Sequence, residues 1–192
     1  WRAALVLTAL AYFLIGRLSL ELAIPPGLAS PLYPSAGIAL ASTLVFGWRV
    51  LPGVALGAFG VNLTTALMRG EAGTEGAGIA AGIACGAMLQ AWVGAALVRR
   101  FVHSPLTLSE PRDIAWFFAL GAVGASLVNS TLSSTLLRLM GSVPAEDWAT
   151  TWVTWWSGDT LGALIAAPVV LTLIGQPRDA WAPRRLPLGV TL

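Results

Sequence analysis

Long apolar runs separated by short polar segments dominate this sequence, and they predict a bundle of membrane-spanning helices. At ~1.5 Å rise per residue, a run of about 20 residues crosses a ~30 Å hydrocarbon core. The pattern favours an all-α, polytopic transmembrane helix bundle with six full or partial spans in a domain of residues 1–175. Residues 176–192 are expected to form a cytoplasmic linker and the start of a seventh span. The six predicted helices cover residues 2–22, 35–46, 51–68, 77–98, 111–139 and 146–175.

The second apolar run is too short to cross the membrane alone. A helix over residues 35–46 covers only ~18 Å, and it begins at Pro34 without a charged flank. Its first turn should therefore lie inside the membrane, where irregular backbone is tolerated only if it is buried in protein or lines a cavity. Tyr33, Pro34, Ser35 and Gly37 thus mark a candidate pocket.

The fifth predicted helix has the opposite problem, because residues 111–139 form a helix of ~42 Å if it is continuous. We expect it to tilt, to kink near residues 121–129, or to project beyond the bilayer. On the fourth helix, glycines at a spacing of four around Gln90 predict a flat packing ridge. The ridge glycines are Gly78, Gly82, Gly86 and Gly94, and Gly53 and Gly57 repeat the device on the third helix.

Composition supports the membrane assignment and narrows the chemistry. Hydrophobic residues make up 56% of the chain and charged residues 10%, whereas soluble domains carry about 25% charge. The net charge of +2 comes from arginines without any lysine, and so small an excess indicates membrane topology and not nucleic-acid binding. One cysteine and one histidine argue against a disulfide framework and against a zinc, haem or iron–sulfur site. We predict no metal and no cofactor.

The arginines also predict the orientation in the bacterial inner membrane. With a cytoplasmic N-terminus, most of them lie inside, as the positive-inside rule requires, and Arg69 and Arg138 lie outside. The arginines placed inside are Arg2, Arg49, Arg99, Arg100, Arg112, Arg178, Arg184 and Arg185.

Polar side chains concentrate at one level in the outer half of the predicted bundle. Counted from the inner helix ends, Arg17, Ser35, Asp159 and Asn129 lie at ~21–26 Å, with Asn62 and Gln90 nearer the middle. An unpaired charge in hydrocarbon costs about 3 kcal/mol, so we predict that Arg17 pairs with Asp159. The alternative is that Arg17 pairs with Glu21 or extends outward, while Asp159 belongs to a structural polar network.

An aromatic stripe on the last helix leads to the same carboxylate. Trp148, Trp152, Trp155 and Asp159 follow spacings of four, three and four, which places them on one helix face. Such a face suits an organic cation, an aromatic ligand or a sugar ring, although an interfacial tryptophan belt would explain the outermost indoles. The candidate ligand-binding residues are Arg17, Tyr33, Ser35, Gly37, Asn62, Gln90, Asn129, Trp152, Trp155, Trp156 and Asp159.

The sequence shows no catalytic constellation. A serine nucleophile needs a nearby histidine, and His103 lies in a predicted cytoplasmic loop, far from Ser35 and Ser130. An intramembrane diaspartyl enzyme would need a second buried aspartate in addition to Asp159. Phosphate-cradling glycine motifs are also missing, so we do not expect this region itself to be an enzyme.

Three segments in order resemble a known family. They are Tyr33-Pro-Ser-Ala-Gly-Ile-Ala-Leu-Ala41, Phe46-Gly-Trp-Arg-Val-Leu-Pro-Gly-Val-Ala-Leu-Gly-Ala-Phe59 with Asn62, and Trp155-Trp-Ser-Gly-Asp-Thr-Leu-Gly162 with Ala167-Pro168. Together they resemble the first of the membrane-associated sensor families (MASE), over nearly all of residues 5–173. Ser35-Ala36 departs from the more frequent double-proline form.

The resemblance implies a sensor of about eight spans that serves as the input module of a bacterial histidine kinase or diguanylate cyclase. It also suggests kinship with a sugar-phosphate sensor kinase that responds to a transporter-like membrane partner. Besides the lipid bilayer, the expected partners are a small-molecule ligand or a membrane protein, and a homodimer formed through the parent protein. Two other functions stay open: a substrate-capture subunit of a transporter, and a ligand-free recruitment or dimerisation module.

Overall fold

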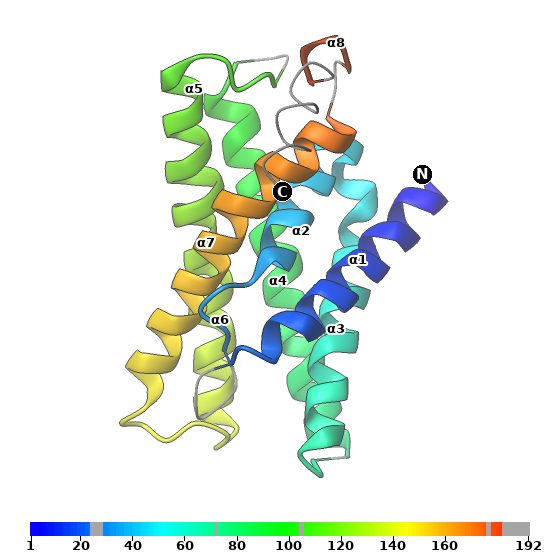
Figure 1. Ribbon diagram of the computed structural model, residues 1–192. Helices are drawn as coiled ribbons and strands as arrows, with labels where there is room; N and C mark the ends of the chain where they lie inside the picture. The colour runs from blue at the N-terminus through cyan, green and yellow to red at the C-terminus, as the bar shows by residue number, and fades with distance from the viewer. Residues whose placement is uncertain (24–28, 72, 104–105, 176–177, 182–192) are drawn as a thin grey trace.

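The computed structural model describes residues 1–23, 29–71, 73–103, 106–175 and 178–181, and within these ranges the secondary structure is helical (Figure 1). The predicted all-α class is therefore confirmed. The expected seventh span at residues 186–192 lies outside the described residues. The elements are α1 (Arg2–Leu20), α2 (Pro34–Phe46), the 3-10 helix η1 (Gly47–Val50), α3 (Leu51–Met68), α4 (Thr74–Phe101), α5 (Pro111–Trp116), the π-helix η2 (Phe117–Gly124), α6 (Ala125–Leu139), α7 (Trp148–Ile174) and α8 (Arg178–Trp181).

The described part of the chain contains five helical stretches long and apolar enough to cross a membrane, and not the six predicted spans. The difference lies at α2, which has 13 residues and is joined through η1 to α3, so that Pro34–Met68 forms one stretch. Gly47 makes the corner between them with φ +77°, a backbone conformation that glycine adopts without steric cost. The predicted short second helix and its tight turn are correct. This helix is too short, however, to form a separate span.

The predicted long fifth helix has the expected bounds, Pro111–Leu139, with an irregular middle. Residues Phe117–Gly124 form a π-helix between α5 and α6. One of the backbone carbonyls of this segment, that of Val123, accepts a hydrogen bond of 3.1 Å from Trp156 Nε1 on α7. The irregularity begins four residues before the predicted kink region of 121–129 and overlaps it over residues 121–124.

The half-length helix α2 occupies the middle of the bundle. All residues from Ser35 to Thr43 are buried, because α7, α1 and α4 pack around this helix (Figure 1). A helix that is apolar on every side requires such a position. The chain therefore places the beginning of α2, where the backbone is irregular, inside the protein and not against lipid.

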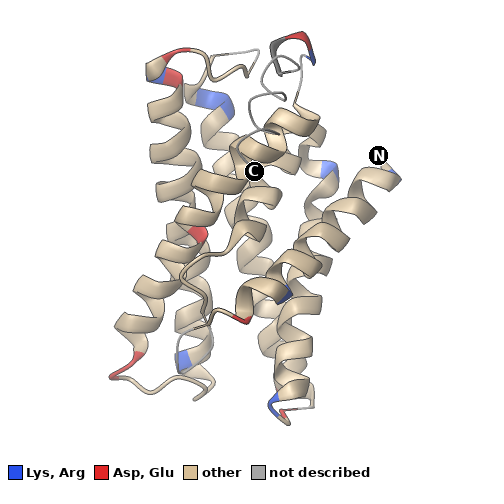
Figure 2. Cartoon of the chain, in the orientation of Figure 1, with Lys and Arg blue, Asp and Glu red and all other residues tan. Residues whose placement is uncertain are grey.

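Most charged residues lie near the two ends of the bundle (Figure 2). The start of α1, η1, the end of α4, the start of α5 and α8 gather at one end (Figure 1). We call this the arginine-rich end, since its helices carry Arg2, Arg49, Arg99, Arg100 and Arg112. The ends of α3 and α6, with Arg69 and Arg138, lie at the opposite end.

The predicted glycine ridge on α4 is correct for three of its four glycines. A Cβ atom at Gly82 would meet Leu136, one at Gly86 would meet the Asn129 amide, and one at Gly94 would meet Ala125 and Leu40. Gly78 has open space around it instead, because it lies on an exposed face of α4. On α3, Gly53 and Gly57 lie against the backbone of α1, as expected for a packing face.

Candidate functional site

The site is organised by an extended segment, residues 29–33, that enters the bundle before α2. The Tyr33 backbone N–H donates a 3.0 Å hydrogen bond to the Gly158 carbonyl oxygen on α7. Neither Gly158 nor Gly162 could carry a Cβ atom, because such an atom would overlap the Ser30 or the Tyr33 carbonyl oxygen. The two glycines of α7 therefore let the incoming backbone lie directly on this helix, halfway along its length.

A hydrogen-bonded contact fixes the start of α2 against α1. Ser35 Oγ donates a 2.9 Å hydrogen bond to the Tyr12 carbonyl oxygen, and the Ser35 side chain is fully buried. The Tyr12 and Tyr33 rings then meet edge to face with their centroids 6.0 Å apart. Two aromatic rings thus line the space between α1 and α7 beside the broken entry into α2.

A buried carboxyl group forms the polar centre of this space. Asp159 of α7 is 1% exposed, and its Oδ2 accepts a 3.1 Å hydrogen bond from Asn129 Nδ2 on α6. Asn129 Oδ1 accepts in turn from Ser133 Oγ at 2.8 Å. Gln90 of α4 and Asp159 line the same small cavity. Three helices therefore meet around one carboxyl group, whose neighbours from α4 and α6 are neutral amides.

A small pocket opens beside Asp159. It is bounded by α1, the 29–33 segment, α3, α4, α6 and α7, and it offers about 20 Å³ to the centres of water-sized molecules. That volume holds one or a few waters. A second, smaller cavity, bounded by Gln90 and Gly121, also contacts Asp159. The main pocket is lined by Tyr12, Leu20, Ala29, Ser30, Tyr33, Val61, Asn62, Ile83, Asn129, Trp155 and Asp159.

Two of the segments that carry the sequence resemblance, the entry into α2 and the middle of α7, meet at this pocket, and Asn62, which accompanies the second segment, also lines it. The family model of MASE1 matches residues 2–188, nearly the whole chain. The chain belongs to the MASE1 family. This is a family of membrane sensory domains found in signalling proteins. No curated protein and no solved structure matched the chain.

The predicted ion pair between Arg17 and Asp159 is wrong for this MASE1 domain. Arg17 points to α3, where its guanidinium donates to Thr65 Oγ1 at 3.0 Å and to Met68 Sδ at 3.1 Å. The distance from Arg17 Nη2 to Glu21 Oε1 is 4.0 Å. Residue counting along a helix gives depth but not direction around the bundle. The arrangement matches the alternative in which Arg17 faces Glu21 and Asp159 joins a polar network.

The predicted aromatic stripe contributes one indole to the pocket. Trp155 lines it, whereas Trp152 and Trp156 stack on each other with centroids 6.0 Å apart. Trp152 Nε1 donates to Thr131 Oγ1 at 3.0 Å, and Trp156 donates to the π-helix. These two indoles therefore lie where α7 contacts α6 and η2, and their placement in a ligand site has no support from this geometry.

Of the other predicted residues, Tyr33, Asn62, Asn129 and Asp159 line the main pocket and Gln90 lines the smaller cavity. Asn62 Nδ2 donates to the Ala58 carbonyl oxygen at 2.8 Å. The remaining two serve packing. Ser35 bonds to α1, and a Cβ atom at Gly37 would strike the backbone of α7 at Gly162 and Ala167.

Sequence reasoning missed the part of the pocket that α1 provides. Tyr12 lies 3% exposed on a buried face of α1, and both cavities contact it. The signal was present, because Thr8, Tyr12, Gly16 and Ser19 recur at spacings of four, four and three, the period of one helix face. In a helix with leucines on its lipid-facing side, that small and polar face marks the protein interior.

Proposed function

We propose that this MASE1 chain is the sensory input module of a bacterial histidine kinase or diguanylate cyclase, and that its pocket receives a small ligand with a cationic group. The module would lie in the inner membrane with its N-terminus in the cytoplasm, as the arginine distribution favours. The observation that carries the proposal is the buried Asp159, whose carboxyl group accepts a hydrogen bond from the neutral amide of Asn129 and shares a cavity with that of Gln90.

The charge of the pocket supports a cationic ligand. A carboxylate buried at membrane depth is costly unless a positive charge compensates it, and Arg17 is bonded elsewhere. Tyr12, Tyr33 and Trp155 surround the carboxyl group with aromatic rings, which attract cations through their π faces. An ammonium group would therefore gain both a counter-charge and an aromatic enclosure.

The size of the pocket supports a sensor that changes shape. The present volume of about 20 Å³ admits water-sized groups, so a larger ligand requires its walls to separate. Helix α1 forms one wall and packs on α3 through Gly53, Gly57 and Gly60, while the 29–33 segment on the opposite wall is bonded to α7. A ligand that binds the separated arrangement better would shift the population toward it.

Helix α2 offers a route from the pocket to the arginine-rich end. It begins next to Tyr33 and ends at the Gly47 corner, and Arg99 of α4 donates to the carbonyl oxygens of Thr43 and Leu44 at 2.6 and 3.1 Å. A displacement of the 29–33 segment would therefore shift α2 and change the contact of its last turn with Arg99 of α4. Output domains that follow the membrane domain would receive the change from that end.

The binding experiment compares cations with neutral molecules of the same shape. The chain in nanodiscs is heated with trimethylammonium compounds and primary amines, and separately with their uncharged isosteres. We expect the amines to raise the melting temperature and the isosteres to leave it unchanged. Asp159→Asn, which keeps the shape of the side chain but removes its charge, should abolish the shift. Equal shifts with neutral isosteres would refute the cation-binding part of the proposal.

A reporter assay with the full-length parent protein tests the signalling part. Asp159→Asn should abolish the response to the active amine while membrane insertion stays normal. The matched control is Asp147→Asn, which removes the same charge from the N-cap of α7, where the side chain makes no capping hydrogen bond. A response that survives in Asp159→Asn, or one that disappears equally in both variants, would contradict the role of the pocket in sensing.

A further inference from the structure

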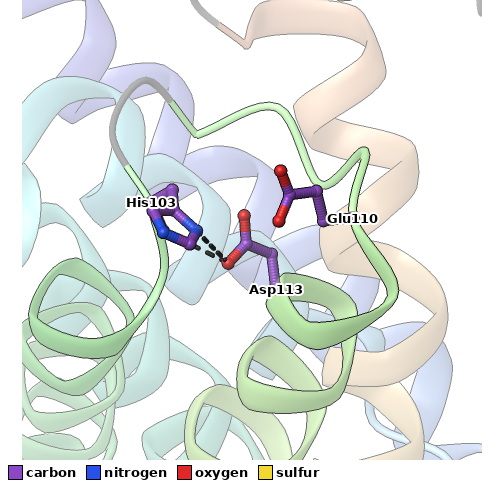
Figure 3. A group of neighbouring side chains, drawn as sticks. All are labelled: His103, Glu110 and Asp113. Atoms are coloured by element: carbon purple, nitrogen blue, oxygen red, sulfur yellow. Dashed lines mark hydrogen bonds and ion pairs between the residues drawn. The ribbon is translucent and has the colours of Figure 1, made fainter.

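Another group of polar side chains lies at the arginine-rich end, far from the Asp159 pocket. His103 follows the end of α4, Glu110 is the N-cap residue of α5, and Asp113 lies in the first turn of α5. One potential ligand atom from each residue lies within 4.8 Å of the other two. Figure 3 shows the imidazole ring and both carboxylates close together between the end of α4 and the start of α5.

The spacing of the donor atoms suits a metal ion. His103 Nδ1 and Asp113 Oδ1 are 2.8 Å apart, and a proton between them accounts for this contact in the structure. Metal–ligand bonds of ~2.1 Å would hold two donor atoms ~3 Å apart at the right angles of octahedral coordination and ~3.4 Å apart at the tetrahedral angles that Zn²⁺ favours. An ion could therefore replace that proton with small movements of the side chains, and Glu110 would supply a third donor from the same side.

The burial pattern resembles that of an anchored but accessible site. The Asp113 side chain is 6% exposed and that of His103 is 65% exposed, and Glu110 is exposed as well. The buried carboxylate is held in place, because its Oδ1 also accepts from the His103 backbone N–H at 3.4 Å. The fold thus fixes the Asp113 carboxylate. His103 and Glu110 lie at the surface, where an ion from solvent can reach them.

The donor set indicates the class of metal. Two carboxylates and a neutral imidazole carry a charge of about −2, which a divalent ion neutralises, and a mixed nitrogen and oxygen set is typical of Zn²⁺ and its first-row neighbours. Arg100 and Arg112 bring positive charge to the same end of the bundle and oppose binding. Arg99 is already bonded to α2. The two arginines should weaken the site without removing its preference for a divalent ion.

We propose that His103, Glu110 and Asp113 bind a divalent transition-metal ion, with water completing its coordination. Such an ion would join the end of α4 to the start of α5 across the loop between them. The numbers of histidine and cysteine residues alone predict no metal site. They leave out the two carboxylates that the fold brings next to the single histidine.

The competing explanation is that Asp113 only stabilises the loop through its bonds to His103. Glu110→Gln separates the two explanations, because Glu110 contributes a carboxylate to the metal site but is exposed and takes no part in the His103–Asp113 contact. The measurement is calorimetric titration of Zn²⁺ into the chain in nanodiscs of neutral lipid. Cys85→Ser is the background and no histidine tag is present, so that neither a thiol nor a tag supplies ligands.

We expect one Zn²⁺ per chain and a melting temperature that rises on its addition and falls back with a chelator. Glu110→Gln should lower the affinity at least about tenfold while the metal-free melting temperature stays unchanged, and His103→Ala should do at least as much to the affinity. The control Glu146→Gln, an exposed carboxylate before α7, should bind as the unmodified chain does. Absence of saturable binding, or equal affinity in Glu110→Gln and the unmodified chain, would overturn the proposal.

Discussion

Gly162 shows how a single missing side chain sets the geometry of the sensory pocket. A Cβ atom there would overlap the Tyr33 carbonyl oxygen and crowd the Pro34 nitrogen. Both of these are backbone atoms, which cannot rotate away as the end of a flexible side chain can. The entry into α2 and the middle of α7 are therefore held at a separation that only glycine permits.

We predict that Gly162→Ala destabilises the chain by about 3 kcal/mol, because overpacking against fixed backbone forces the two segments apart. Thermal unfolding in detergent measures the effect. Gly78→Ala is the matched control, since that position on α4 has open space around it and alanine favours a helix by about 1 kcal/mol over glycine. Equal melting temperatures of the two variants would show that the contact at Gly162 does not limit stability.

At the scale of single residues, the sequence predicts which side chains carry polar chemistry better than it predicts the direction in which they point around the bundle. Proline and the short apolar run locate the broken entry at Tyr33 and Ser35, and the isolated acid in an apolar run locates Asp159. Which way a side chain points around the bundle depends on how whole helices pack, and a single sequence carries this information weakly. For that reason the sequence pattern places Arg17 and Trp152 at the pocket, although both side chains bond elsewhere in the structure.

Among the elements, α2 depends most on its neighbours. The backbone N–H of its C-cap residue Gly47 donates to the Thr43 carbonyl oxygen, and Arg99 of α4 donates to the carbonyl oxygens of Thr43 and Leu44 near the same end. A guanidinium at the end of a helix also compensates the negative end of its dipole. Arg99 of the neighbouring helix α4 therefore caps the C-terminal end of α2.

We predict that Arg99→Gln destabilises the chain by about 1 kcal/mol, since hydrogen bonds from a charged donor are lost at a partly solvated position. If α2 carries the signal, the variant should also lower the amine response of the full-length protein more than its stability explains. Arg100→Gln is the control, because Arg100 is an exposed neighbour on the same helix turn. A loss of response that is the same in both variants would indicate a general charge effect and not the contact to α2.

The elements themselves follow closely from the hydrophobic pattern, with one exception that the pattern hides. Helix bounds agree within a few residues, since long apolar runs between polar segments specify where each helix enters and leaves the membrane. The π-helix at Phe117–Gly124 leaves no such mark. Its Val123 carbonyl oxygen accepts a hydrogen bond from Trp156 on α7, and a local sequence pattern does not reveal such a contact between distant helices.

For the molecule as a whole, the distribution of arginines predicts one orientation in the membrane. We expect Trp48→Cys, on η1, to face the cytoplasm and Glu146→Cys, before α7, to face the outside; both positions are exposed. In a Cys85→Ser background, a membrane-impermeant maleimide should label Glu146→Cys in intact spheroplasts and Trp48→Cys only after lysis. The reverse labelling pattern would contradict the predicted orientation and place the His103 group outside.

The dependence of α2 on α7 also constrains how the protein is made. The Tyr33 N–H finds its acceptor on Gly158, and an unsatisfied amide in hydrocarbon costs several kcal/mol. We therefore expect the entry into α2 to reach its final depth only after α7 has been synthesised and has packed against it. Docking of α7 is therefore the step that we expect to fix the position of the entry into α2.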